Sequence, residues 1–308
     1  MMEIIGFILH GKIRGKKKVK QSLINKFSAD YELRFYETVQ PRHAEELTGK
    51  ALSEGCNFLI AVGGDGTLNE MVNGYLKTRL TSGVNASIGV LPFGTGNDFA
   101  RGTGITRDIN QLSEMIRLNQ PRMLDAGRME FQHPDGSKTI RYFDNIADLG
   151  IGGDVVGRVN GVHLIKTVLG GKFNFFVAIL VTFLSYKHKR VKVSWDGNEW
   201  EGQVLSLVVA NGRYFGSGLG IAPEAKPDDG KFELVIFANL SIIDYLLNYS
   251  RLRKAEKIIH PEVFYHRTSK VFVESGGGTV IVEADGEIEG AAPIVYTCLP
   301  GSLRFLVP

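Results

Sequence analysis

Two glycine-rich stretches in the first third of the chain carry residues that could bind a nucleotide. In the first of them, Gly63, Gly64 and Gly66 enclose Asp65 directly after the apolar run Phe58–Val62. Glycine permits positive φ angles and lets a ligand approach the backbone, and loop amides before a helix form an anion site. Bound phosphate would repel the Asp65 carboxylate unless that group holds a metal ion or takes a proton. This stretch therefore indicates nucleotide chemistry.

The residues after this loop, Thr67 to Glu70, predict the start of a helix. They fit a capping box, in which the Thr67 hydroxyl accepts from the backbone N–H of the third helical residue while Glu70 reaches back. The alternative is a tight strand-to-helix turn of an ordinary α/β domain, with Asp65 acting only as a cap. Three glycines around an acid exceed what such a turn requires, although the loop alone does not choose among nucleotide kinases.

A second glycine stretch follows at Gly94 and Gly96. Both glycines permit close approach to the backbone, and Asn97 and Asp98 then open a predicted helix. The stretch is not a dinucleotide fingerprint, because the third glycine of that pattern would fall at position 99, which is Phe99. A plain N-cap is the alternative role for Asp98.

Two acidic turns lie in the last third of the chain. Asp285 and Glu287 would share one face of a regular strand, and the intervening Gly286 makes a tight hairpin turn the competing geometry. A carboxylate can accept the proton of an alcohol late in phosphoryl transfer. The segment Asp228–Gly230 also fits a hairpin turn, which is compatible with a hard cation such as Mg²⁺ bound by oxygen ligands.

The front of the chain alternates strands and helices. The predicted strands are Ile4–Leu9, Leu33–Thr38, Phe58–Val62 and Ser87–Leu91, with helices through 44–51 and over 68–80. This order predicts an α/β fold with a doubly wound, parallel, Rossmann-like nucleotide domain. Ligands of such sheets bind beyond the carboxyl ends of the strands, where both glycine stretches are expected. The basic segment His10–Lys18 could touch phosphates or form a solvated helix start.

Beyond residue 127 the pattern changes to short strands joined by Asp-Gly turns. The predicted strands cover 128–131, 139–143, 191–195, 202–210, 232–238, 270–273 and 279–283, with helices near 154–186 and 241–255. Hairpin spacing of this kind predicts an antiparallel β-sandwich. We therefore expect a nucleotide-binding domain over 1–127 and a β-sandwich domain over 128–301, with 302–308 returning to the first domain.

Composition excludes several classes of protein. The 308 residues are 44% hydrophobic and 22% charged, and the net charge of +3 is too small to indicate a nucleic-acid partner. Cys56 and Cys298 show no metal or redox spacing, and an acidic N-terminus argues against a signal peptide, so a cytoplasmic protein is expected. The apolar run 173–186 is shorter than a membrane span of ~20 residues. A buried helix is the preferred interpretation of this run, and a helix bordering lipid is the alternative.

The two glycine stretches together resemble the catalytic domain of diacylglycerol kinases, and in particular the soluble bacterial lipid kinases. The matching segments are Gly63–Thr67 with Asn69 and Glu70, Pro92–Arg101, Thr38 with His43 and Ala44, Asn211–Ala225, Asp229–Gly230 and Ala284–Glu287. The resemblance spans nearly the whole chain. One departure is His10–Gly11, where the family usually carries Asn-Pro.

The resemblance implies a phosphofructokinase- and NAD-kinase-like nucleotide domain, with ATP and substrate in a cleft between two domains. The residues that would hold ATP are Thr38, Gly63, Gly64, Asp65, Gly66, Thr67, Leu68, Asn69, Gly94, Thr95, Asn97 and Asp98. Asp285 would accept the proton of the lipid hydroxyl with support from Glu287, and Asp65 would act with the catalytic Mg²⁺ or in the same acid network. A second, structural Mg²⁺ would be held by Asp229 and by main-chain oxygens near Lys226 and Lys231.

The favoured hypothesis is an ATP-dependent lipid kinase that transfers the γ-phosphoryl group to the hydroxyl of diacylglycerol or a related lipid alcohol. It would be cytoplasmic and reach its substrate transiently at the inner face of the membrane, through apolar surface or basic patches. For the basic run Lys187–Arg190, a solvated strand edge is the slightly preferred interpretation. The rivals are a NAD kinase-like enzyme acting on a soluble metabolite and a nucleotide- or lipid-binding regulator without turnover. A homodimer is left open.

Overall fold

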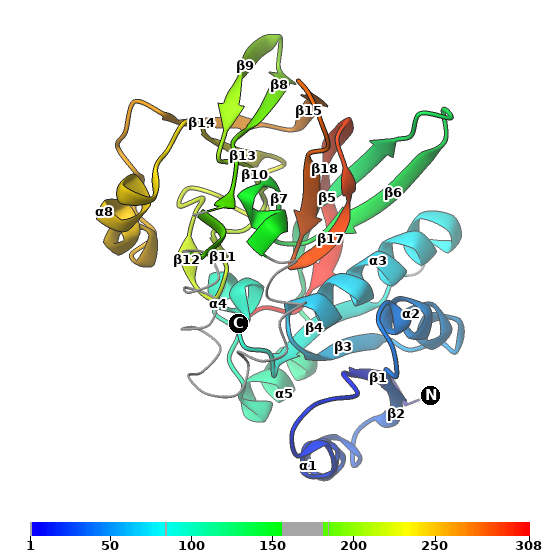
Figure 1. Ribbon diagram of the computed structural model, residues 1–308. Helices are drawn as coiled ribbons and strands as arrows, with labels where there is room; N and C mark the ends of the chain where they lie inside the picture. Colours follow the sequence, from blue (N-terminus) through cyan, green and yellow to red (C-terminus); the bar gives the residue numbers. More distant parts are fainter. Residues whose placement is uncertain (1, 84, 156–180, 184) are drawn as a thin grey trace. The chain divides into compact units, whose positions relative to one another are not determined.

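The computed structural model describes residues 2–83, 85–155, 181–183 and 185–308. The chain divides into two compact units (Figure 1), here called unit 1 (Met1–Leu124 with Gly301–Pro308) and unit 2 (Asp125–Pro300). Residues 151–155 and 181–183 are helical. Most of the helix expected near 154–186, and most of the apolar run 173–186, lies outside the described residues.

Unit 1 is built on a parallel sheet. Its strands are β1 (Ile4–Leu9), β2 (Glu32–Glu37), β3 (Phe58–Gly63) and β4 (Ser87–Pro92), in the order β2-β1-β3-β4. Every residue of β3 and β4 is buried, as expected for apolar strands covered on both faces. Phe305, the last residue of β18, pairs in parallel with Ile88 of β4. The strands predicted for this part of the chain are confirmed.

Helices cover both faces of this sheet. They are α1 (Lys16–Phe27), α2 (His43–Ser53), α3 (Asp65–Ser82), α4 (Asp98–Thr103) and α5 (Ile109–Leu118). Leu23 of α1 and Ile116 of α5 pack with Phe7 and Ile60 in one buried cluster. Helices α2 and α3 pack against each other, and Figure 1 shows them on the opposite face of the sheet from α1. The doubly wound arrangement is therefore confirmed.

The predicted capping box at the start of α3 is wrong. The N-cap of α3 is Gly64, which has no side chain to cap the helix, and Thr67 lies inside the first turn. The carboxylate of Glu70 instead accepts hydrogen bonds from the backbone N–H groups of Arg42, at 2.8 Å, and Ala44, at 2.9 Å. Glu70 thus satisfies amides at the beginning of α2, a helix distant in the sequence.

Unit 2 contains two antiparallel sheets. The first comprises β5 (Arg122–Gln132), β6 (Lys138–Phe143), β8 (Lys189–Trp195), β9 (Asn198–Val204), β15 (Lys270–Ser275) and β18 (Ile294–Phe305), of which β5 and β18 extend into unit 1. The second comprises β7 (Ile146–Gly150), β10 (Ser206–Ala210), β13 (Phe232–Phe237), β14 (Val263–Thr268), β16 (Ile281–Ala284) and β17 (Glu287–Ala291). The short strands β11 (Tyr214–Phe215) and β12 (Leu219–Gly220) form a separate pair.

One buried cluster joins the two sheets of unit 2. Phe131 and Val193 from the first sheet pack with Leu149 and Leu234 from the second, which confirms the predicted β-sandwich. The single strand predicted over 202–210 is wrong, because β9 and β10 belong to different sheets. The chain turns at Leu205, whose N–H lies 2.8 Å from the carbonyl oxygen of residue 237 and 2.9 Å from that of residue 238.

Helix α8 (Ile242–Arg253) follows β13. Its N-terminus has a capping box, in which the Ser241 hydroxyl accepts from the N–H of Asp244 and the Asp244 carboxylate accepts from the N–H of Ser241. Tyr245, Tyr249 and Leu252 pack against the outer face of the second sheet. Within the described parts of the chain, no helix has both the length and the apolar character needed to cross a membrane.

Candidate functional site

The two glycine stretches meet at the carboxyl ends of β3 and β4. A Cβ atom placed on Gly64 would lie 2.9 Å from the Cα of Gly94, and one placed on Gly94 would lie 2.5 Å from the Cα of Gly64. The N–H of Phe93 also donates to the carbonyl of Gly63 at 2.6 Å. Only glycine permits backbones to approach this closely. The two predicted loops therefore form one glycine-lined surface at the expected edge of the sheet.

Asn97 fixes the shape of the second loop. Its side-chain oxygen accepts from the N–H of Gly94 at 2.9 Å, and its side-chain nitrogen donates to the carbonyl of Gly94 at 2.9 Å. Asn97 has a φ of 51° and is the N-cap of α4, which begins at Asp98. The interpretation of Asp98 as a plain N-cap is therefore wrong, because Asp98 already belongs to the helix.

The carboxylates of Asp65 and Asp98 both approach Gly96. A Cβ atom on Gly96 would lie 3.0 Å from Oδ2 of Asp65 and 3.2 Å from Oδ2 of Asp98. Oδ1 of Asp65 accepts from the N–H of Phe99 at 3.4 Å, so Asp65 also contacts the start of the neighbouring helix α4. Burial raises the pKa of the Asp65 carboxyl, and the amides at the start of α4 oppose that rise.

This arrangement can accommodate both an anion and a cation. Helix α3 has no side-chain cap, so its first amides are available to phosphate oxygens. Carboxylate oxygens from Asp65 and Asp98 suit a hard cation, which commonly takes one or two protein carboxylates together with substrate phosphates. Among the described residues, no group of three or more His, Cys, Asp or Glu side chains is arranged to hold a metal ion by itself. Nε of Arg101 lies 3.7 Å from Oδ1 of Asp98, so these two carboxylates suit a metal ion that a nucleotide brings with its phosphates.

Thr38 lies against the loop after β1. Its hydroxyl accepts from the N–H of Gly11 at 3.0 Å, and its own N–H donates to the carbonyl of Leu9 at 2.9 Å. In the same loop, Nδ1 of His10 accepts from the N–H of Lys12 at 3.3 Å. His10 therefore shapes its own loop, and Thr38 lies beside that loop.

The other predicted nucleotide residues differ in what they can offer a ligand. Leu68 and Asn69 are buried within unit 1, and Thr67 packs beneath Gly63, where a Cβ atom would come within 2.5 Å of its hydroxyl. These residues can contribute backbone groups and support rather than exposed side chains. Thr95 is exposed and can offer its hydroxyl directly.

The Asp285 turn belongs to unit 2. Asp285 and Gly286 have φ angles of 48° and 90° and form the two-residue turn between β16 and β17, so the regular-strand geometry is wrong. Oδ2 of Asp285 accepts from the N–H of Asp144 at 3.0 Å, and Oδ1 accepts from the N–H of Ile146 at 2.9 Å. Glu287 follows as an exposed residue. The Asp285 carboxylate is thus held in one orientation.

A buried pair of acids that was not predicted supports this turn. Asp148 of β7 and Glu283 of β16 are directly opposed across the sheet, and Oε2 of Glu283 accepts from the N–H of Gly286 at 3.0 Å. The Ser206 hydroxyl donates to Asp148 at 3.1 Å. Burial raises the pKa of Asp148 to about 6, and burial with the adjacent Asp148 raises the pKa of Glu283 well above its usual range. The pair therefore retains a proton at pH values where an exposed acid would lose it.

This buried pair predicts a pH-dependent effect of the Asp148→Asn substitution. The folded protein holds the proton from about pH 4 to pH 6 while the unfolded chain releases it, so stability falls as pH rises through this window. Asparagine does not titrate, so the variant lacks this fall in stability. We expect the free energy of unfolding near pH 8 to exceed that of the unsubstituted protein by on the order of 2 kcal/mol, and the gain to disappear near pH 4. Urea unfolding at several pH values measures both quantities, and an unchanged pH dependence would contradict the assignment.

Asp229, which was predicted to hold a structural metal ion, is engaged by neighbouring protein groups. One oxygen of Asp229 is ion-paired with Arg267, and the other accepts from the N–H of Lys231 at 3.1 Å. Lys226 and Lys231 are exposed. A guanidinium group beside Asp229 opposes a bound cation, so a metal ion at Asp229 would have to displace Arg267.

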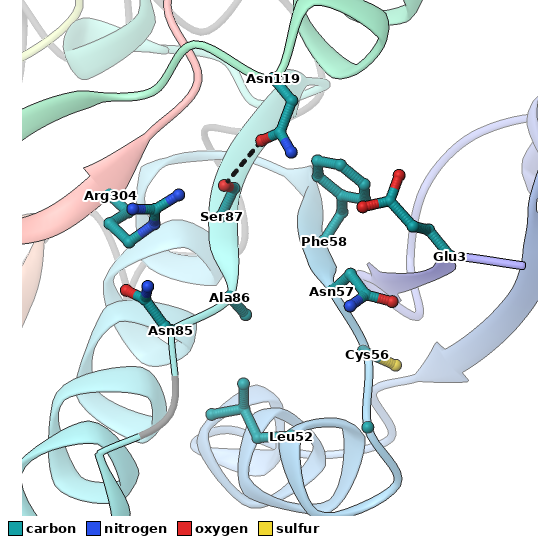
Figure 2. Close-up of a pocket in the computed structure, with 11 residues that line it drawn as sticks. Glu3, Leu52, Cys56, Asn57, Phe58, Asn85, Ala86, Ser87, Asn119 and Arg304 are labelled. Atoms are coloured by element: carbon teal, nitrogen blue, oxygen red, sulfur yellow. Dashed lines mark hydrogen bonds between the residues drawn. The ribbon is translucent and has the colours of Figure 1, made fainter. Parts of the chain in front are cut away.

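A separate hollow lies at the opposite, amino-terminal ends of the strands of unit 1 (Figure 2). Its volume is about 350 Å³. Beside it, the hydroxyl of Ser87 at the start of β4 donates a hydrogen bond to the side-chain oxygen of Asn119 at 3.3 Å. Arg304 and Glu3 also line it. Because the glycine loops lie at the carboxyl ends, this hollow is not part of the candidate nucleotide site.

The fold and the glycine loops define a class of protein. The chain combines a parallel α/β unit, whose two glycine loops lie beside Asp65 and Asp98, with a β-sandwich unit. The family model "Diacylglycerol kinase catalytic domain" matches residues 7–129, and "YegS C-terminal NAD kinase beta sandwich-like domain" matches residues 146–307. The chain therefore belongs to the diacylglycerol kinase family and is a kinase with an alcohol acceptor. Such kinases use ATP and usually a divalent metal ion.

Individual relatives agree with this assignment. A diacylglycerol kinase of Staphylococcus carnosus is 28% identical over 305 residues, which cover 97% of this chain and 92% of the relative. The crystal structure of a diacylglycerol kinase from Bacillus anthracis has the same fold, with a TM-score of 0.71 at 17% identity over 100% of this chain and 97% of that one. Yeast NADH kinase in complex with NADH is also similar in fold, with a TM-score of 0.54 at 10% identity over 96% and 78% of the two chains.

Proposed function

We propose that this protein transfers the γ-phosphoryl group of ATP to the hydroxyl of diacylglycerol or a related lipid alcohol. The observation that carries the proposal is the contact between the loops of Gly64 and Gly94, which gathers Asp65 and Asp98 beside one glycine. Family membership supports the lipid class of the acceptor. The NAD kinase alternative draws on similarity of fold and on the first glycine loop, which does not choose among nucleotide kinases.

In this proposal the backbone of unit 1 holds the phosphates. Amides at the uncapped start of α3 bind phosphate oxygens, and the loop fixed by Asn97 closes around them. Asp65 and Asp98 hold Mg²⁺, which neutralises charge on the phosphates when it is bound. Thr38 and Thr95 complete the nucleotide contacts. The protein's own task is therefore to position and to stabilise charge rather than to form a covalent intermediate.

Asp285 acts as the proton acceptor. Each of its carboxylate oxygens accepts one backbone N–H bond, so the carboxylate is oriented by the backbone of Asp144 and Ile146. Glu287 is exposed on the other side of the turn and supports Asp285 in accepting the proton of the hydroxyl. The rigid turn gives Asp285 the fixed orientation that a general base requires.

We also propose that unit 2 binds a second Mg²⁺, which has a structural role. Binding by Asp229 and by main-chain oxygens near Lys226 and Lys231 requires Asp229 to release Arg267. We also propose that the protein works in the cytoplasm and meets its substrate at the inner face of the membrane.

The test is a transfer assay with radiolabelled ATP and Mg²⁺. The purified chain is incubated in parallel with detergent-dispersed diacylglycerol, with a total lipid extract and with NAD, and labelled products are separated and identified by mass. We expect label in a lipid phosphate and none in NAD. Label in NAD alone would reject the lipid function, and ATP binding without any labelled product would favour a regulator.

A further inference from the structure

Helix α8 presents an apolar stripe to solvent. Ile243, Leu246 and Leu247 are 63%, 48% and 76% exposed, respectively. Their spacing of three and four residues places them on one face of the helix. Three large apolar side chains gathered on one exposed face differ from the single exposed residues found on most protein surfaces, and such a patch marks an interaction site.

The opposite face of α8 fixes the orientation of this stripe. Leu252 is buried, and Tyr245 and Tyr249 pack with it against the core on the outer face of the second sheet. The ring of Tyr245 also lies 5.4 Å from that of Phe183. Since one face is anchored by aromatic packing, the apolar stripe does not turn inward. Figure 1 shows α8 at the outside of unit 2, beside the segment that leads to β14.

Basic residues continue the same stripe towards the C-terminus of the helix. Arg251 and Lys254 follow Leu247 at four and seven residues, and both are exposed. No ion pair of either residue is present in the described part of the chain, and Arg251 makes one long hydrogen bond of 3.4 Å to the carbonyl of Lys257. The nearest acid on the helix, Asp244, is engaged in the capping box and lies 3.6 Å from His260.

A second segment adds to the apolar end of the stripe. Ile259 is 83% exposed, and the adjacent His260 lies against Asp244 in the first turn of α8. The backbone at Ile259 therefore passes close to the first turn of α8. The stripe therefore has an apolar end, which can contact acyl chains, and a cationic end, which can contact anionic groups.

We propose that α8 docks this protein on an anionic lipid bilayer. Ile243, Leu246 and Leu247 enter the boundary between headgroups and acyl chains, while Arg251 and Lys254 meet the phosphates of anionic lipids. This surface rests on the proposed function, because a lipid kinase must reach a substrate that resides in a bilayer. A second copy of the chain fits less well, since its own α8 brings the same basic residues.

The basic run Lys187–Arg190 is a weaker candidate for this contact. Lys189 and Arg190 belong to β8, and the guanidinium of Arg190 pairs with Glu201 of β9 at 2.9 Å. His188 lies 3.0 Å from the carbonyl of Leu240. Arg190 is thus engaged within the sheet as at a solvated strand edge, and we assign the membrane contact to α8, where the basic residues continue an apolar stripe.

The experiment is flotation of the full chain with lipid vesicles. One set of vesicles contains phosphatidylcholine alone, and the other contains phosphatidylcholine with phosphatidylglycerol. We expect the double variant Ile243→Ser, Leu247→Ser to lose binding by about tenfold or more. We expect Arg251→Gln, Lys254→Gln to lose mainly the preference for anionic vesicles and its salt sensitivity. The control is Leu80→Ser, Leu118→Ser, which changes two exposed leucines of unit 1 (63% and 48%).

Failure of the docking surface is distinguishable from failure of the lipid kinase function. Activity towards a short-chain, water-soluble diacylglycerol should be the same in all three variants and in the unsubstituted protein. Equal vesicle binding by the α8 variants and the control would overturn the docking proposal even if the kinase is active. Sedimentation compares the self-association of the α8 variants with that of the unsubstituted protein. If the α8 variants lose self-association but still bind vesicles, the stripe contacts a second copy of the chain and the docking proposal is overturned. Vesicle binding that depends on α8 in a protein without lipid kinase activity would retain the surface and reject the function.

Discussion

The Asp285→Ala variant is expected to lose about 10²- to 10⁴-fold in kcat while binding ATP as tightly as the unsubstituted protein. That range is the usual contribution of a positioned general base. The ATP site proposed here lies in the loops of unit 1, whereas Asp285 belongs to unit 2. Single-turnover transfer to diacylglycerol measures the loss of rate, and calorimetric titration with ATP and Mg²⁺ measures the binding.

A structural effect of the same substitution must be separated from the chemical one. Alanine leaves the backbone N–H groups of Asp144 and Ile146 without their acceptor, which costs about 1–3 kcal/mol for each buried group. Asp285→Asn keeps one acceptor oxygen and the side-chain shape but cannot take a proton. We expect Asn to recover part of the stability and none of the activity, as measured by urea unfolding and by transfer at saturating substrate.

The chain offers a matched control in Asp135. This aspartate also lies in a hairpin turn of unit 2, between β5 and β6, and its Oδ1 accepts from the N–H of Ser137 at 2.9 Å. Asp135→Ala therefore removes a turn aspartate with a backbone bond and should leave turnover unchanged. Unaltered turnover in Asp285→Ala would reject the base assignment. Equal losses in both variants would show that the effect is one of folding.

Local sequence predicts the parallel sheet of unit 1 because strands that are buried on both faces consist of apolar residues. β3 is wholly apolar and β4 is apolar after Ser87, and each strand ends in glycine-rich sequence where it meets its loop. The rule that loops after parallel strands share one edge then predicts that the two glycine stretches meet. Their contact at Gly64 and Gly94 was predictable to that extent.

Features that depend on distant pairing were not predictable in this way. Thr67 and Glu70 match a capping box, but tertiary contact assigns Glu70 to the start of α2 instead. Asp148 and Glu283 become neighbours only through the register of β7 and β16, which no local pattern specifies. Likewise, no glycine, proline, Asp or Asn lies between Gln203 and Ala210 to mark the break at Leu205. A polar residue inside an apolar strand, such as Asp148, is the one available signal.

The Gly64→Ala variant is expected to lower kcat/KM by about 100-fold, with most of the loss in ATP affinity. Gly64 has a φ of −99°, so its own backbone conformation admits alanine. The added methyl group would nevertheless lie 2.9 Å from the Cα of Gly94, and backbone cannot rotate away as a side chain can. The loops must separate, and misplacement of bound groups by about 1 Å can cost 10²-fold in rate.

A glycine in the neighbouring helix provides the control. Gly49 lies in the interior of α2, and a Cβ atom there would meet only the hydroxyl oxygen of Thr78, at the ordinary contact distance of 3.7 Å. Gly49→Ala should therefore leave ATP binding unchanged and raise the free energy of unfolding by about 0.5–1 kcal/mol. Calorimetric titration with ATP and thermal unfolding of each variant measure the two effects.

The double variant tests whether the two loops act as one site. A Cβ atom on Gly94 would lie 2.5 Å from the Cα of Gly64, so Gly94→Ala separates the same pair of backbones. Changes at residues that share one contact are not additive, and the second methyl group should add much less than a further 100-fold. Additive losses would mean that each glycine acts alone. ATP affinity unchanged in both single variants would remove the glycine loops from the nucleotide site, and with them the basis of the proposed function.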